Sequence, residues 1–219
     1  MPKYFIDDVR SSSGKLKIAD YLIFVEGKDD AWFFECLMDH MRIDPTKASV
    51  NYAGGKDRLA SYIGLALRSH DYTSKRVLGY AIVRDADGDK DVAEKAIEEI
   101  LQELGEACPS AGSVGQTVDG RRLGFYLFPG NGKIGDLETL LLGVAAHPMK
   151  AASIATHYSD IVAKHGELDH SSKRMVQAYL AVASSPLCSG AGRGMQVGAF
   201  DRSAPALNDI ARFIRDLII

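Results

Sequence analysis

Short apolar runs alternate with helix-like stretches over the first half of this sequence. The runs and the stretches follow one another, in chain order, at residues 20–25, 31–41, 49–53, 56–69, 77–83 and 91–104. A β-α-β-α-β-α order is typical of a parallel sheet whose strands are connected by helical crossovers. The sequence therefore predicts an α/β fold. In the helix over 91–104 we expect the inner stripe to be formed by Val92, Ala96, Ile100 and Leu104.

The pattern changes after residue 104. Asp119-Gly120 lies between Gln116-Thr117-Val118 and the apolar run 123–128, which indicates a hairpin and hence an antiparallel edge. Further helices are predicted, at 136–146, 148–164, 171–184 and in a last segment that carries Leu207, Ile210, Ala211, Ile214 and Leu217 on one face. Residues 185–205 are rich in Gly, Ser and Pro, and we expect a long loop there.

Composition excludes several classes of protein. A chain of 219 residues is long enough for one sizeable domain with an added part. Its net charge of −3 argues against a protein that binds nucleic acid by unspecific electrostatics. Cys36, Cys108 and Cys188 are far apart and form no CxxC pair, which disfavours a structural zinc site or a disulfide framework. The sequence shows neither a signal peptide nor a membrane span, so we expect a cytoplasmic protein that does not contact membranes.

Acidic residues follow two of the apolar runs. Glu26-Gly27 follows the first run, and Asp85-Ala86-Asp87 follows the third. Two carboxylates one residue apart at the mouth of a strand are expected to point the same way, because side chains alternate along a strand. In an open parallel sheet ligands gather at the carboxyl ends of the strands. Oxygen-only ligation there suits Mg²⁺ or Mn²⁺. The plainer alternative is that Asp85 and Asp87 are turn and cap residues of the next helix.

These two motifs resemble the signature motifs of the TOPRIM domain, a Mg²⁺-binding module. Val25-Glu26-Gly27 and Val83-Arg84-Asp85-Ala86-Asp87-Gly88 carry the resemblance, which covers roughly residues 20–140. It is strongest to small stand-alone TOPRIM-related proteins of unknown function and to the nuclease domain of OLD-family proteins. It implies a compact Rossmann-like fold with a mainly parallel sheet, flanking helices and a helical C-terminal extension. We accordingly expect a metal-binding domain over residues 18–146, and an extension over 147–219 that packs on the same core.

The resemblance also implies roles for single residues. Glu26 is expected to serve as a metal ligand or general acid/base, and Asp85 and Asp87 to hold Mg²⁺ or Mn²⁺. Glu138 is assigned as a further ligand, although Asp136 and Glu138 are explained equally well as acids at the positive end of a helix. Lysine often stabilises developing charge at such sites. Lys173 is our first choice, and its rivals are Lys56 and Lys133.

Three functions of different classes follow from these patterns. The first is a Mg²⁺-dependent phosphoryl-transfer enzyme acting on DNA or RNA, a nuclease of TOPRIM/OLD type, with an ATPase as a conceivable protein partner. The second is a non-catalytic TOPRIM-like module that binds nucleic acid, a nucleotide or a protein. The third is a small-molecule phosphohydrolase that uses Asp-x-Asp after a strand. We rank it last because Asp89 stands where such enzymes carry Thr or Val.

Overall fold

A five-stranded sheet with the order β2-β1-β3-β5-β4 forms the centre of the protein. The computed structural model describes residues 2–7, 14–74, 76–130, 132–166, 171–184, 187–188 and 190–218. The strands are β1 (Tyr21–Val25), β2 (Ala48–Tyr52), β3 (Gly79–Asp85), β4 (Val114–Gln116) and β5 (Arg122–Phe128). All neighbours are parallel except β4, which pairs antiparallel with β5 at the edge. The predicted α/β class and the antiparallel edge are confirmed.

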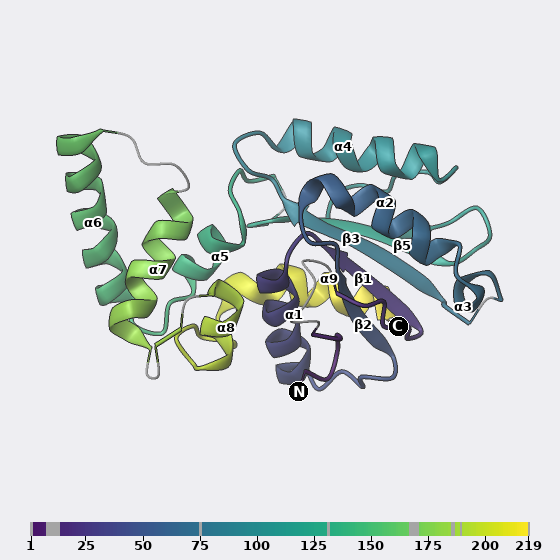
Figure 1. The fold of residues 1–219 in the computed structure, drawn as a ribbon, viewed down its shortest axis with the longest axis horizontal. Helices are drawn as coiled ribbons and strands as arrows, with labels where there is room; N and C mark the ends of the chain where they lie inside the picture. The colour runs from purple at the N-terminus through teal and green to yellow at the C-terminus, as the bar shows by residue number, and fades with distance from the viewer. Residues whose placement is uncertain are drawn as a thin grey trace.

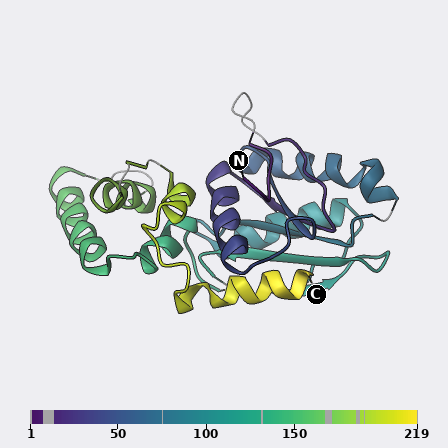
Figure 2. The same cartoon turned by 90° about the horizontal axis from the view of Figure 1, so that it is seen from below.

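Helices cover both faces of the sheet (Figures 1 and 2). One face is covered by α2 (Lys56–Leu67), α3 (His70–Thr73) and α4 (Lys90–Glu103), and the other by α1 (Lys28–His40) and α9 (Asn208–Ile218). The remaining helices lie beyond the carboxyl end of β3 in Figure 1: α5 (Leu137–Gly143), α6 (Pro148–His165), α7 (Ser171–Ala183) and α8 (Ala191–Gln196). A short 3₁₀ helix, Pro205–Leu207, precedes α9.

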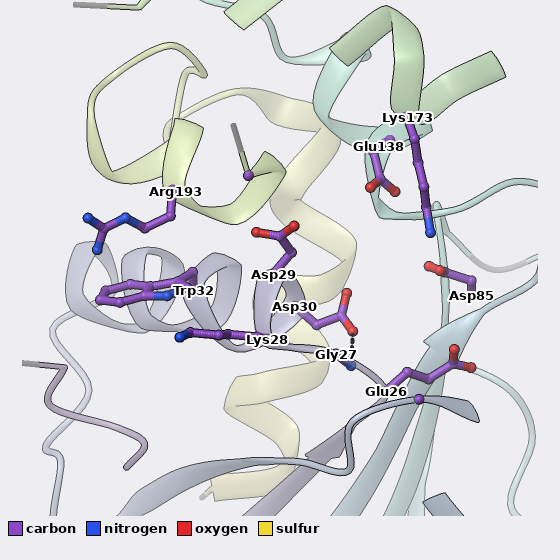
Figure 3. Close-up of a pocket in the computed structure, with 12 residues that line it drawn as sticks. Glu26, Gly27, Lys28, Asp29, Asp30, Trp32, Asp85, Glu138, Lys173 and Arg193 are labelled. Atoms are coloured by element: carbon purple, nitrogen blue, oxygen red, sulfur yellow. Dashed lines mark hydrogen bonds between the residues drawn. The ribbon is translucent and has the colours of Figure 1, made fainter. Parts of the chain in front are cut away.

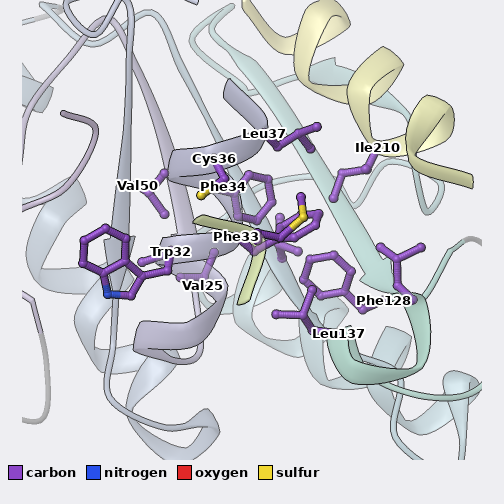
Figure 4. Packing of buried hydrophobic residues seen from close by; sticks show 14 of the residues in the cluster. Val25, Trp32, Phe33, Phe34, Cys36, Leu37, Val50, Phe128, Leu137 and Ile210 are labelled. Carbon is purple, nitrogen blue, oxygen red and sulfur yellow. The ribbon is translucent and has the colours of Figure 1, made fainter. Parts of the chain in front are cut away.

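Both faces of the sheet are buried, which explains why its strands read as continuous apolar runs. In β1, Leu22 and Phe24 join the core beneath α2 and α4, while Ile23 and Val25 join the core beneath α1 and α9. In the core beneath α1 and α9, the ring of Phe33 packs edge-on against Phe128, with the centroids 5.4 Å apart (Figure 4). This contact fixes α1 against the end of β5, and so places the first turn of α1 beside the carboxyl ends of the strands.

The predicted inner stripe of α4 was only partly right. Ile100 and Leu104 are partly buried and pack against the core, but Val92 is 65% exposed, and the fully buried residues are Ala93, Ile97 and Leu101. Both stripes repeat every four residues, so spacing alone could not separate them. The start of the helix decides the orientation: the Asp89 side chain caps it by accepting hydrogen bonds from the backbone N–H groups of residues 91 and 92. Val92 therefore lies in the exposed first turn.

The predicted loop over residues 185–205 was also wrong, because it contains α8 and part of the 3₁₀ helix. Three of its glycines, Gly190, Gly192 and Gly194, are closely packed against neighbouring atoms. A Cβ atom on Gly192 would lie 1.9 Å from the backbone oxygen of Asp29 and 2.8 Å from Cβ of Trp32. Only glycine lets α8 approach α1 this closely, so residues that looked like loop formers are what brings two helices together.

Substituting Gly192 by alanine should therefore destabilise the protein. The added methyl group has backbone on one side and cannot be accommodated without moving α8, which should lower the free energy of unfolding by about 1–3 kcal/mol. Gly64→Ala is the matched control, because Gly64 lies inside α2 and no described residue outside this helix comes within 4 Å of the place its Cβ atom would take. We expect that control to gain roughly 0.5–1 kcal/mol. Urea unfolding measures both, and equal effects would contradict the packing argument.

The C-terminal helix returns to the sheet. Phe213 of α9 lies over β5, where a Cβ atom on Gly124 would come within 2.8 Å of its ring. Tyr126 packs against the same ring in a tilted arrangement, at a centroid distance of 5.5 Å. The expected division into residues 18–146 and 147–219 stays a prediction.

Within the described part of the chain, no helix combines the length and the apolar character needed to cross a bilayer.

Candidate functional site

A cleft of about 540 Å³ opens where the strands end, between the sheet and the helices that follow it (Figure 3). The parallel register pairs Val25 of β1 with Val83 of β3. Glu26 and Asp85 therefore leave neighbouring strands at the same edge of the sheet, and both line the cleft. The adjacency that the sequence predicted for these two carboxylates is present in the structure. Their assignment as metal ligands stays a prediction.

Asp87 does not accompany Asp85 into the cleft. We expected the two side chains to point the same way because of strand alternation, but β3 ends at Asp85 and the backbone of Asp87 is left-handed, with φ of 51°. Alternation no longer applies beyond the strand. The Asp87 carboxylate is exposed, and its Oδ2 lies 3.8 Å from Nζ of Lys56. Its charge still raises the pKa of Glu26, so Asp87 belongs to the electrostatic surroundings of the cleft.

The two acids at the start of α5 have different roles. Asp136 is the helix cap, because its Oδ1 accepts hydrogen bonds from the backbone N–H and the hydroxyl of Thr139, at 2.9 and 2.6 Å. Glu138 is only 8% exposed and lines the cleft. The same helix also touches the end of β3, since the backbone N–H of Leu137 donates to Oδ1 of Asp85 at 3.0 Å. The first turn of α5 thus places Glu138 in the same cleft as Asp85.

Of the three candidate lysines, Lys173 lines the cleft. It extends from α7 with its amine directed toward Asp85 (Figure 3). Burial acts to lower the pKa of Lys173, but the carboxylates of Glu138 and Asp85 outweigh it and the pKa is raised, so the amine stays charged. Lys56 is exposed and faces Asp87, and Lys133 lines other hollows of the surface. Our first choice among the lysines is thus the one that the structure places at the site.

Sequence reasoning missed Asp30 because it expected the first helix to begin at residue 31. The helix α1 already begins at Lys28, so Asp30 lies in its first turn and lines the cleft with Glu26. Its Oδ2 accepts a hydrogen bond from the backbone N–H of Gly27 at 2.7 Å. The signal was present: an acid four residues after Glu26, at the start of the helix that follows the same strand, must lie at the same edge of the sheet.

The carboxylates of the cleft are costly to ionise together. Burial is the main cause that raises the pKa of Asp85, Glu26 and Glu138, and repulsion from neighbouring acids adds to it. The pKa of Asp30 is raised to about 7 for the same two reasons. The positively charged side chains near these acids do not cancel the rise in their pKa values. Such raised pKa values are expected of acids that share a bound cation.

One oxygen of Glu26 has no satisfactory partner. Its Oε1 is buried and lies 3.2 Å from Nε of Arg84, yet neither atom makes a hydrogen bond. The ion pair is close enough to lower the pKa of Glu26 but not aligned enough to satisfy the oxygen. Buried acceptors without a hydrogen bond are rare in folded proteins, so this oxygen of Glu26 is available to a ligand that enters the cleft.

Charge and donor chemistry fit a hard divalent cation. The acidic residues of the cleft offer only oxygen atoms, which suits Mg²⁺ or Mn²⁺, and an ion would relieve the repulsion among them. The spacing is not yet that of a filled site: among the residues that the structure describes, no three His, Cys, Asp or Glu side chains are gathered closely enough to hold an ion. Side-chain rotation on ion binding would have to close the remaining gap.

The raised pKa of Asp30 should make the metal-free protein less stable as the pH rises. The carboxyl titrates near 3.8 when unfolded and near 7 when folded, so folding takes up a proton between these values. The stabilisation is complete below about pH 4 and is lost as the pH rises through about 7. Asp30→Asn keeps an acceptor for Gly27 and cannot ionise, so it should remove roughly 1–3 kcal/mol of the decline between about pH 5 and pH 8. Urea unfolding in EDTA tests this, and an equal decline in both proteins would contradict it.

Comparison with known proteins gives a family and a fold. A family model described as protein of unknown function (DUF3226) matches residues 20–219. No curated protein matches the sequence. The C-terminal region of the Burkholderia pseudomallei OLD protein is similar in structure, with a TM-score of 0.53 and 15% identity over 93% of this chain and 100% of that chain. The C-terminal region of the Xanthomonas campestris pv. campestris OLD protein gives a TM-score of 0.49 and 13% identity over 93% and 98%. The first of these similarities confirms the predicted OLD-type fold.

Proposed function

The chain belongs to the DUF3226 family of proteins of unknown function, and we propose that it is a Mg²⁺- or Mn²⁺-dependent phosphoryl-transfer enzyme that cleaves nucleic acid. One observation carries this proposal. Three segments that are distant in the sequence bring Glu26, Asp85 and Glu138 to one cleft at the carboxyl ends of parallel strands, and a charged lysine extends from a fourth. Carboxylates that converge on one cleft with raised pKa values are typical of active sites.

The residues of the cleft divide the work between them. Glu26, Asp85 and Glu138 would hold the ion, with Asp30 behind them as a fourth acid. When bound, a divalent cation neutralises charge on a phosphate and activates water for attack. In its alternative role as general acid/base instead of ligand, Glu26 would accept a proton, and burial, which raises its pKa, favours that role. Lys173 would keep a positive charge opposite these acids and stabilise the charge that develops on the phosphate. Asp87 stays a predicted ligand that would have to turn inward from the rim.

Nucleic acid is the substrate that the fold favours. The chain has the fold of the C-terminal region of an OLD protein, and its two acidic motifs resemble those of TOPRIM domains. The acidic residues are confined to a cleft, and the net charge of −3 does not favour binding of nucleic acid over a broad basic surface. We therefore propose local recognition of a phosphodiester and not general electrostatic attraction. An ATPase partner, as in some OLD-type systems, stays a prediction.

Incubation of the purified chain with end-labelled DNA and RNA tests the proposed function. We expect cleavage products of at least one of these nucleic acids in Mg²⁺ or Mn²⁺ and none in EDTA. The substrates should include single-stranded and double-stranded forms. Absence of cleavage with every substrate and either metal would contradict the proposal that this chain is a nuclease by itself.

A second function is favoured by one observation. Arg84 already faces Glu26, and no three candidate ligands in the described part of the chain are gathered for an ion. A TOPRIM-like module that binds a nucleic acid, a nucleotide or a protein without metal would keep such an arrangement. Metal titration separates the two functions. The enzyme should gain thermal stability in Mg²⁺ or Mn²⁺, whereas the binding module should not.

A further inference from the structure

The cleft has a second half that the proposed chemistry does not use. Opposite the acids, its wall is formed by Lys28, Trp32, Gly190 and Arg193, from the start of α1 and from α8 (Figure 3). Lys28 is already paired, since its Nζ lies 2.6 Å from Oδ1 of Asp7. Among the described residues no carboxylate forms an ion pair with Arg193. The cation on this wall that is open to an anionic ligand is therefore Arg193.

The guanidinium of Arg193 is held in place by an aromatic ring. Its Cζ lies 4.6 Å from the centroid of the Trp32 ring, within the range of a cation–π interaction. Trp32 is itself only 6% exposed and packs edge-on against Phe5, with the centroids 5.0 Å apart. A ring fixed in this way restrains the arginine side chain at the cleft and leaves its N–H groups able to bind a ligand. Arginine presents these donors in a planar fork that matches a phosphate.

Two local features allow α8 to pack closely on α1. Gly192 lets the helix approach to a distance that any side chain would prevent. Asp29 then accepts hydrogen bonds from the backbone N–H groups of Ala191 and Gly192, and these bonds act to lower its pKa against the larger effect of burial. The charge of Asp29 is thus engaged with α8. An anion beside Arg193 is therefore repelled less by carboxylates than an anion in the acidic half of the cleft.

We propose that Arg193, stacked on Trp32, anchors a phosphate of the substrate strand that flanks the reacting phosphodiester. The reacting phosphate would lie in the acidic half, and its neighbour along the strand would reach the opposite wall. This inference rests on the proposed function, because it takes the substrate to be an oligonucleotide. A free phosphate or a mononucleotide offers the same chemistry to the arginine, and the experiment must separate these ligands.

The chain contains a reporter for this site, because Trp32 is its single tryptophan. The full chain is titrated in Mg²⁺ with a short end-labelled phosphorothioate oligonucleotide, which resists hydrolysis. Anisotropy of the label gives the affinity, and Trp32 fluorescence reports whether the ligand reaches this wall. Parallel titrations use thymidine 5′-monophosphate and orthophosphate. The variants are Arg193→Gln, Arg193→Lys, and Arg212→Gln as an exposed arginine on α9.

We expect the oligonucleotide to change the fluorescence of Trp32 in a saturable way. Arg193→Gln should weaken its affinity about tenfold to a hundredfold, as for the loss of a charged hydrogen bond, while Arg193→Lys keeps part of the affinity. Arg212→Gln should behave as wild type. Each variant is compared with wild type in thermal unfolding, so that a loss of affinity is interpreted only in a folded protein.

Other outcomes overturn the inference in distinguishable ways. Cleavage and binding by wild type, with equal affinity in Arg193→Gln and Arg212→Gln, would refute the anchor and leave the proposed function standing. Equal, Arg193-dependent affinity for orthophosphate or the mononucleotide would refute the oligonucleotide as its ligand. A wild-type chain that neither binds nor cleaves any oligonucleotide would remove the proposed function, and the anchor with it.

Discussion

Replacing Asp85 by asparagine should abolish the response of this protein to divalent metal. Asparagine keeps an oxygen that can accept the hydrogen bond from the backbone N–H of Leu137, so the start of α5 is preserved. It also removes a carboxyl group whose ionisation is unfavourable in the metal-free protein, because burial and repulsion raise the pKa of Asp85. The metal-free variant should therefore be at least as stable as wild type. Its nucleic-acid cleavage should fall by about a thousandfold or more, since several kcal/mol of transition-state stabilisation are lost.

Two measurements on Asp85→Asn separate a metal site from a structural acid. Wild type should gain about 2.7 kcal/mol of unfolding free energy at a metal concentration about a hundred times the dissociation constant, and the variant should gain none. Asp209→Asn is the matched control, because Asp209 is exposed on α9 and paired with Arg212. If Asp85→Asn loses stability in EDTA while its gain from metal is unchanged, Asp85 holds the fold together and not an ion.

Replacing Lys173 by methionine should separate metal binding from catalysis. Methionine retains much of the length of the side chain and removes its charge. The Lys173 amine and a bound cation would both be attracted to the carboxylates of Glu138 and Asp85, and they would repel each other. Loss of the amine should therefore leave metal affinity unchanged or increase it. Cleavage should nevertheless fall by about a hundredfold to a thousandfold, the usual effect of removing one group that stabilises the transition state. Cleavage rates and metal-dependent thermal shifts, measured side by side, test both statements.

The controls for Lys173 come from the same helical extension. Lys150→Met removes an exposed charge from α6 and should change neither measurement, while Lys173→Arg should recover part of the cleavage because the charge is kept. A fall in cleavage that is matched by a fall in metal affinity would show that Lys173 supports the fold of the site. No change in cleavage would remove it from the mechanism.

The fold was predictable from the sequence as far as it depends on local patterns. The three apolar runs, the Asp119-Gly120 turn and the parallel crossovers are enough to place Glu26 and Asp85 at one edge of a parallel sheet, where the strand order confirms them as neighbours. Features that depend on packing were not predictable. Both apolar stripes of α4 have the same spacing, and the glycines of α8 have the composition of a loop. In each case the deciding contact lies outside the pattern itself.

The candidate site divides in the same way. Glu26, Asp85, Glu138 and Lys173 line one cleft as the patterns suggested. Asp87 lies at the rim because the chain turns left-handed one residue after Asp85-Ala86, a change of direction that strand alternation does not anticipate. Asp30 was overlooked because the helix was expected to begin one residue after it, whereas α1 begins at Lys28. Its position relative to Glu26, and not its residue type, makes it part of the site.

The central claim is that the acids at the end of β1 and β3 hold a divalent cation. Anomalous diffraction from crystals soaked in Mn²⁺ tests it most directly, because the ion is located independently of activity. We predict an anomalous peak in the cleft within coordination distance of the carboxylates of Glu26 and Asp85, absent from crystals of Asp85→Asn. A fully soaked crystal with no peak in this cleft, or with the same peak in Asp85→Asn, would contradict the account.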